Sequence, residues 1–296
     1  MRVCLIRLCS LKQNLKWRAK HLYLLNLAIA DLLVTLFCMP STVVTILYRL
    51  WLSGLVMCKL GAFLQGVAVA TGIFTLTAMS VDRYLSIQHP SHAHWRSSPR
   101  HAALITGVVW SASAAFMSPQ LYVRVVDTLQ LEGLPTMTFC IEQWPRGRDR
   151  QIFGSLLLLV VYVIPVAIVA VCYANVGRML CSYTMSRDDS NTSTGTYIYC
   201  RRRAARALFC LVGLFIVCWL PYNVISLLVD LGLADSLVSS LPFTLWLGHA
   251  HSAVNPVLYW ATNKQFRHVA SRVFQALRCP GTRGKRSRNR RYPRRV

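Results

Sequence analysis

Acidic side chains are scarce in this sequence: 10 Asp and Glu stand against 33 Lys and Arg among 296 residues, for a formal net charge of +23. Inside the apolar stretches acids are rarer still, and Asp31 stands nearly alone there. A transporter or channel would need internal repeats or paired charges within its spans, so this scarcity argues against both. Neither a CxxC nor a Cys/His spacing suggests a metal site, and no nucleophile with an adjacent base suggests an enzyme.

Apolar residues, 54% of the chain, are segregated from the basic ones, as they are in proteins that cross a bilayer. A helix that spans a membrane needs about 20 mostly apolar residues, and lipid admits only structures whose backbone hydrogen bonds are closed. Short links between several runs make neighbouring helices antiparallel. We therefore expect an all-α membrane protein with six complete spans, at residues 22–47, 60–87, 102–122, 152–180, 204–233 and 241–261.

The distribution of Lys and Arg sets the orientation of the predicted bundle. Basic residues crowd the segment before the first run and the links after the second and fourth runs, whereas most acids fall in the opposite links. Because cytoplasmic loops carry the excess of Lys and Arg, this side and the C-terminal tail are expected in the cytoplasm. Residues 1–10, MRVCLIRLCS, are too short to span. We interpret them as the cytoplasmic end of an earlier helix that the chain lacks; an interfacial anchor is the alternative.

Two of the 11 cysteines, Cys58 and Cys140, are expected on the extracellular side. The others fall in the predicted helices or toward the reducing cytoplasm. An oxidising compartment favours a disulfide between Cys58 and Cys140, and two free thiols are the alternative.

Six short signatures follow one another along the chain. One of them is VDRYLSIQHP, in which Asp82-Arg83-Tyr84 closes an apolar span. The others are NLAIAD ending at Asp31, Trp110, Pro165 with Tyr173, Phe215 with the CWLP that ends at Pro221, and the NPVLY of Asn255 to Tyr259. Together these signatures resemble the rhodopsin-like (class A) G-protein-coupled receptors from about Lys12 to about Cys279. By this resemblance, the missing span is the family's first helix.

The resemblance implies a class A bundle with six of the family's seven transmembrane helices, a short amphipathic cytoplasmic helix and an extracellular β-hairpin loop, over residues 1–277. A basic tail, 278–296, follows. It also implies that ligand binding moves the cytoplasmic end of the sixth helix outward and opens a site for a heterotrimeric G protein, with arrestin as a second partner. The residues that it assigns to the activation switch are Asp31, Ile73, Pro165, Phe215, Trp219, Asn255, Pro256 and Tyr259. Those that it assigns to G-protein coupling are Asp82, Arg83, Tyr84 and Tyr173.

An allosteric sodium ion is the one cofactor that the resemblance raises. It would bind Asp31, Ser252 and Asn255, and an ionisable group deep in an apolar run is by itself a candidate functional site. Gly72 stands where the resemblance leads one to expect a serine, and His251 stands where an asparagine is common. Sodium regulation therefore stays open.

The resemblance also narrows the ligand. Gln65 stands where amine receptors carry an aspartate, and the last run holds no lysine for retinal. Two strand-like stretches, 122–126 and 137–141, predict a hairpin lid, and the chain looks most like the neuropeptide FF, orexin and neuropeptide Y receptors. The resemblance implies a peptide with an Arg near an amidated C-terminus, whose cation meets an unpaired Asp230; the alternative is that Asp230 only solvates a helix end. The expected ligand-binding residues are Thr42, Gln65, Glu142, Trp219, Tyr222, Asn223, Asp230 and Leu245.

The C-terminal segment has features of its own. Residues 263–274 place apolar side chains at helical spacing against basic ones, which predicts an interfacial helix under the bilayer. Cys279 is a palmitoylation candidate or a bystander thiol. The Arg-rich tail is interpreted as a contact with anionic lipid and not with nucleic acid. The alternative to a working receptor is a truncated, signalling-incompetent isoform or an incomplete gene model.

Overall fold

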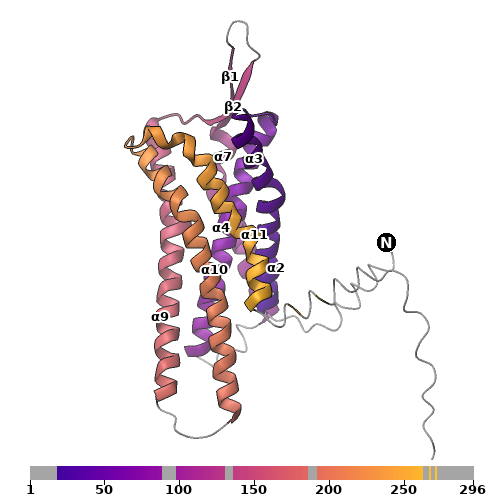
Figure 1. Ribbon diagram of the computed structural model, residues 1–296, viewed down its shortest axis with the longest axis vertical. Helices are drawn as coiled ribbons and strands as arrows, with labels where there is room; N and C mark the ends of the chain where they lie inside the picture. The colour runs from indigo at the N-terminus through magenta and orange to yellow at the C-terminus, as the bar shows by residue number, and fades with distance from the viewer. Residues whose placement is uncertain are drawn as a thin grey trace, which may run out of the picture.

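The computed structural model describes residues 19–88, 98–130, 136–185 and 192–262, with Arg267 and Ser271 as isolated positions. Its helices run along the long axis of the molecule, and a two-stranded hairpin projects from one end, near α3 and α7 (Figure 1). We call this the hairpin end. The helices are α2 (Ala19–Leu33), η1 (Val34–Cys38), α3 (Met39–Tyr48), α4 (Gly54–Gln88), α6 (Pro99–Met117), α7 (Pro119–Val123), α8 (Gly147–Leu157), η3 (Leu158–Val163), α9 (Ile164–Met185), α10 (Thr192–Asp230), η4 (Asp235–Ser240) and α11 (Leu241–Thr262).

Five helical stretches among the described residues are long and apolar enough to cross a membrane: His21–Tyr48, Gly54–Ser86, Pro99–Val123, Gly147–Met179 and Leu208–Asp230. The sequence predicted six. The sixth run does form a 22-residue helix, α11, which packs against α10 and α3. It carries His249, His251 and Asn255, and these polar residues lower its mean hydropathy. All three are buried inside the bundle.

Two spans contain a π-helical turn that the sequence analysis did not predict. Val34–Cys38 separates α2 from α3 and precedes Pro40, and Leu158–Val163 separates α8 from α9 and precedes Pro165. Proline has no N–H to donate and its ring collides with the preceding turn, so a wider turn before it relieves both problems. The wide turn η3 thus accommodates Pro165. Pro221 and Pro256 lie inside α10 and α11.

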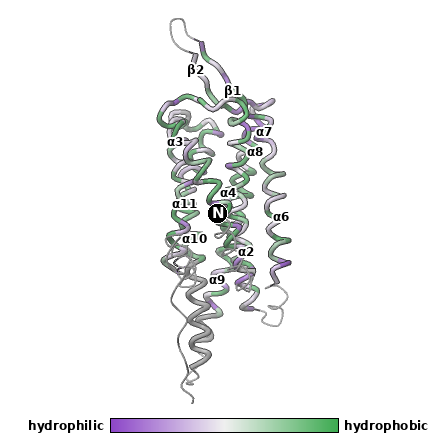
Figure 2. The backbone as a smooth tube through the Cα atoms, turned by 90° about the vertical axis from the view of Figure 1, so that its right-hand side faces the viewer, coloured by the Kyte–Doolittle hydropathy of each residue, from purple (hydrophilic) through white to green (hydrophobic). Residues whose placement is uncertain are grey.

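Helix α4 is central, because it packs against α2, α6, α9 and α10. The largest fully buried side chains include Leu27, Ile73, Leu76 and Phe215, which belong to one core cluster. Many large apolar side chains point outward instead; Leu104, Phe209 and Val217 are each more than 60% exposed. Apolar residues prevail along the helices (Figure 2). An apolar outer surface suits a helix bundle in hydrocarbon, where backbone groups are satisfied internally.

The predicted hairpin is confirmed. Strands β1 (Arg124–Leu129) and β2 (Met137–Glu142) pair antiparallel, with Val126 opposite Cys140. β1 begins two residues later than expected, because Tyr122 and Val123 end the short helix α7.

Several predictions concern residues outside those described. They are the segment 1–18, most of the predicted amphipathic helix 263–274, Cys279 and the tail 278–296.

Candidate functional site

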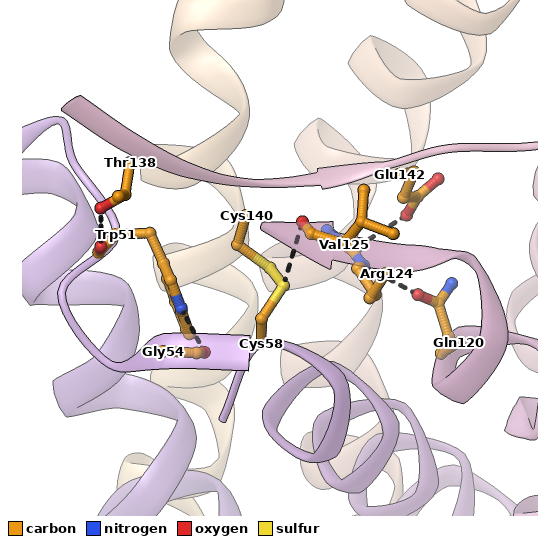
Figure 3. The surroundings of a disulfide bond; sticks show 9 residues. All are labelled: Trp51, Gly54, Cys58, Gln120, Arg124, Val125, Thr138, Cys140 and Glu142. Atoms are coloured by element: carbon orange, nitrogen blue, oxygen red, sulfur yellow. Dashed lines mark hydrogen bonds and ion pairs between the residues drawn. A yellow bond between two sulfur atoms is a disulfide. The ribbon is translucent and has the colours of Figure 1, made fainter. Parts of the chain in front are cut away.

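The hairpin is tied to the bundle at two places (Figure 3). A disulfide joins Cys58, near the start of α4, to Cys140 of β2, with the Cα atoms 5.7 Å apart. The predicted disulfide is therefore confirmed. In the loop between α3 and α4, the Trp51 backbone N–H donates to Thr138 O at 2.7 Å, and the Thr138 hydroxyl donates to Trp51 O. The covalent and hydrogen-bonded ties together hold the strands to the hairpin end.

A charged cluster closes the base of the hairpin. Arg124 Nη2 donates to Glu142 Oε1 at 2.6 Å, and its Nε donates to Gln120 Oε1 at 2.9 Å. Trp144 Nε1 donates to the other carboxylate oxygen of Glu142 at 3.0 Å, and its ring packs on Phe153 of α8. Glu142 was expected to contact the ligand. Both of its oxygens already have partners in this structure, so its evident role is to join the hairpin to α7 and α8.

Trp219 lies in the middle of α10 within a cluster of packed rings. Its centroid is 6.1 Å from Phe215 below it in the core and 5.8 Å from Tyr222 one turn along the helix. His249 and His251 of α11 face it at 5.8 and 6.2 Å. Phe215 and Trp219, which the resemblance assigns to the activation switch, therefore lie in contact. Sequence reasoning missed His249, which is fully buried.

A single imidazole nitrogen links Trp219 to α11. Trp219 Nε1 donates to His251 Nδ1 at 3.2 Å, while the same Nδ1 lies 2.8 Å from Gly248 O. An indole N–H only donates and a carbonyl only accepts, so one tautomer of His251 satisfies Trp219 and the other satisfies Gly248. The hydrogen bond of the Trp219 indole therefore forms only with the His251 tautomer whose Nδ1 carries no proton.

Four further residues that were expected to bind ligand lie on four different helices: Thr42 on α3, Gln65 on α4, Asn223 on α10 and Leu245 on α11. Thr42 is buried and its hydroxyl donates to Cys38 O in its own helix at 2.9 Å. Asn223 Nδ2 donates to Trp219 O at 2.8 Å. Gln65 and Leu245 are half-buried. The Thr42 and Asn223 side chains thus each donate to a backbone oxygen four residues earlier in the same span. Among the hydrogen bonds of the described residues, none involves the Gln65 side-chain amide.

The prediction that Asp230 is unpaired is wrong. Asp230 ends α10 and its carboxylate Oδ1 lies 3.0 Å from Nε of Arg150 in α8. Gln151 Nε2 donates to the backbone oxygen of Asp230 at 2.8 Å. The sequence offered no signal for this pairing, because the two partners lie on separate helices.

Buried polar residues of different helices are joined by hydrogen bonds. Asn255 Nδ2 donates to both carboxylate oxygens of Asp31, at 3.2 and 3.0 Å. Asn26 accepts from Trp110 Nε1 at 2.6 Å and donates to Thr75 Oγ1 at 2.7 Å. The structure thus brings Asp31 and Asn255 together as expected, which leaves Asp31 bonded to an amide donor.

The neighbours of that pair bear on the possible sodium site. Ser252 Oγ lies 3.4 Å from His251 Nε2. Gly72 contributes no oxygen, and a Cβ at this position would touch only Leu27, at 3.8 Å. Sodium prefers several oxygen ligands, and these two positions offer one hydroxyl.

At the end opposite the hairpin, Asp82, Arg83 and Tyr84 occupy the last turns of α4 and are half-buried. Tyr173 of α9 packs edge-on against Phe209, with centroids 5.9 Å apart. The hydroxyl groups of Tyr173 and Tyr259 are both buried. The residues assigned to coupling therefore gather at one end of the bundle.

Comparison with known proteins gives a consistent picture. Residues 3–259 match the model of the 7 transmembrane receptor (rhodopsin family). Neuropeptide FF receptor 1 of Rattus norvegicus is 30% identical over 276 residues, which cover 88% of this chain and 63% of that receptor. Galanin receptor type 1 of Homo sapiens is 31% identical over 258 residues, covering 86% and 71%. The pyroglutamylated RF-amide peptide receptor of Rattus norvegicus is 27% identical over 261 residues, covering 83% and 60%. The chain spans less than two thirds of the first and third of these relatives.

Proposed function

The chain belongs to the rhodopsin family of seven-transmembrane receptors, and on that premise we propose that it is a plasma-membrane receptor that binds an extracellular neuropeptide and activates heterotrimeric G proteins. The hairpin end would face outward, and Arg83 would face the cytoplasm. Arrestin is a further partner in this proposal.

The observation that carries the proposal is the chain of packed rings that joins α10 to η3 inside the bundle. Tyr222 contacts Trp219, Trp219 contacts Phe215, and Phe215 contacts Tyr162 of η3 at 6.1 Å. Tightly packed interiors transmit displacement, because they switch between discrete packings and do not deform continuously. A ligand that displaces Tyr222 or Trp219 would therefore repack Phe215 and with it the contact between α10 and η3.

The wide turn at η3 and the interior prolines supply the places where the helices can bend. Pro221 lies two residues beyond Trp219 in α10, and Pro165 follows η3. Movement of the part of α10 farthest from the hairpin end would expose Arg83, Tyr173 and Tyr259, so that a G-protein helix could bind there. The ligand acts by population shift, so an agonist works only through its higher affinity for the open packing.

A peptide is the ligand class that the hairpin end fits best. Gln65 offers an amide where a free acid would be needed for an amine. The relatives include receptors named for neuropeptide FF, galanin and an RF-amide peptide. We propose that a peptide with an Arg near an amidated C-terminus enters between α4, α10 and α11, with Asp230 as its cation site and Gln65 near its amide.

A peptide-library screen with calcium and cyclic AMP readouts tests the proposed function. Cells that express the receptor should respond to at least one amidated peptide. The matched control is the Arg83→Ala receptor at equal surface density, which should bind the same peptide without responding. A response to biogenic amines in place of peptides, or no response to any peptide, would overturn the proposal.

A further inference from the structure

The junction between α8 and α10 at the hairpin end contains an ion pair that the proposed ligand must meet. Arg150 Nε lies 3.0 Å from Asp230 Oδ1. The side chain of Arg150 is 47% exposed and that of Asp230 only 11%. The cation therefore lies over the acid on the solvent side, and a ligand reaches the carboxylate only after Arg150 has moved.

The junction is also held by contacts that do not involve the Arg150 side chain. Gln151 donates to the backbone oxygen of Asp230 at 2.8 Å. Gly154, one turn along α8 from Arg150, leaves the space that the Asp230 carboxylate fills, since a Cβ there would lie 2.5 Å from Oδ2. Asp230 is therefore held in place by α8 even when Arg150 swings away.

We propose that Arg150 is a specificity-determining residue, an internal competitor that occupies the cation site of Asp230 until a ligand cation replaces it. This inference rests on the proposed function and extends it to a residue outside the expected ligand set. Only a ligand group that matches a guanidinium in charge and hydrogen bonding displaces Arg150. A neutral or anionic group at that position leaves the resident pair intact.

The exchange is physically balanced. One guanidinium replaces another on the same carboxylate, and Arg150 moves into water along a stem that is already half exposed. Because the Arg150 end of the pair is 47% exposed, water screens the attraction, and the competitor lowers the affinity of the ligand without blocking it. The apparent affinity equals the intrinsic affinity multiplied by the fraction of receptors in which Arg150 has left Asp230. Arg150 would thus add to specificity, because it penalises ligands that lack a cation at this position and still admits those that have one.

The experiment uses two probes on membranes that contain the full chain: a synthetic peptide that ends in Arg-Phe-amide, and the same peptide with citrulline in place of Arg. Citrulline keeps the shape of Arg and removes its charge. Competition binding is measured on the wild-type receptor and on the Arg150→Gln, Asp230→Asn and double variants. Arg148→Gln is the matched control, because it removes the same charge from an exposed position in the same helix.

Arg150→Gln should raise the affinity for the Arg peptide by roughly threefold to tenfold, leave the citrulline peptide unchanged, and exceed the effect of Arg148→Gln. Asp230→Asn should abolish the preference for Arg over citrulline, and in the double variant the first substitution should add nothing.

Weaker binding of the Arg peptide to Arg150→Gln would overturn the inference, because Arg150 would then be a ligand contact. Unchanged binding, or an equal gain for both peptides, would overturn it too. If neither peptide binds any variant, the proposed ligand class fails as well, and that result is distinct from binding that ignores Arg150.

Discussion

Gly248 is the position at which the packing of Trp219 is most open to test. A Cβ at Gly248 would lie 2.9, 3.0 and 3.1 Å from Cδ2, Cε3 and Cε2 of the Trp219 indole. Carbon atoms in contact prefer about 3.5–4.0 Å, so Gly248→Ala forces the ring to retreat by about half an ångström or more. The ring cannot turn aside freely, because its Nε1 is bonded to His251 and its face packs on Phe215.

Overpacking of a well-packed core costs about 1–3 kcal/mol. The clash arises from the position that the Trp219 ring has in this packing. We therefore expect Gly248→Ala to destabilise this packing more than the active packing, in which the ring has moved. A shift of ~1.4 kcal/mol changes a two-state ratio tenfold. If the active packing holds about 1% of receptors at rest, Gly248→Ala should raise basal signalling about tenfold and lower the melting temperature of the ligand-free receptor.

The assay is basal cyclic AMP or calcium signalling normalised to surface density, together with thermal unfolding in nanodiscs. Gly213→Ala is the matched control, since it lies in α10 and a Cβ there would meet nothing within 4 Å. Equal basal activity and equal melting temperature for the Gly248 and Gly213 variants would refute the argument that Trp219 packing sets the resting state.

Three further predictions concern other parts of the bundle. Arg83→Ala should abolish agonist-evoked signalling and keep surface display, as measured by antibody binding to intact cells; preserved G-protein activation would contradict the assigned role. Intact-mass analysis should find Cys58 and Cys140 oxidised until reductant is added, and loss of the bond should destabilise the receptor by about 2–4 kcal/mol; two free thiols in folded protein would contradict the disulfide. Exchange of sodium for N-methylglucamine should change agonist affinity less than about twofold, because Asp31 already accepts from an amide and Gly72 supplies no oxygen; a large shift would support a sodium site at Asp31, Ser252 and Asn255.

The sequence predicted the features that depend on hydropathy, charge and short motifs. The spans follow from apolar runs because lipid demands them. The bounds differed, two π-helical turns were not predicted, and α11 is not among the five stretches that are apolar enough to cross a membrane. The Cys58–Cys140 disulfide followed from compartment, since the other cysteines were expected in helices or toward the cytoplasm. Strand-like alternation was enough to predict the hairpin. Each of these signals is local, so no knowledge of packing was needed.

Tertiary structure alone decided which polar groups meet. Gln151 and Asp230 are 79 residues apart, and Asp31 and Asn255 are 224 apart. The motif resemblance suggested the second pair, but nothing in the sequence suggested the contact between α8 and α10 that neutralises Asp230. An exposed acid and a buried, paired acid have the same letter in a sequence, and they differ only in which helix face lies opposite. For this protein, the sequence alone therefore determined the spans and the two ends, whereas the state of the expected cation site depended on how the helices pack.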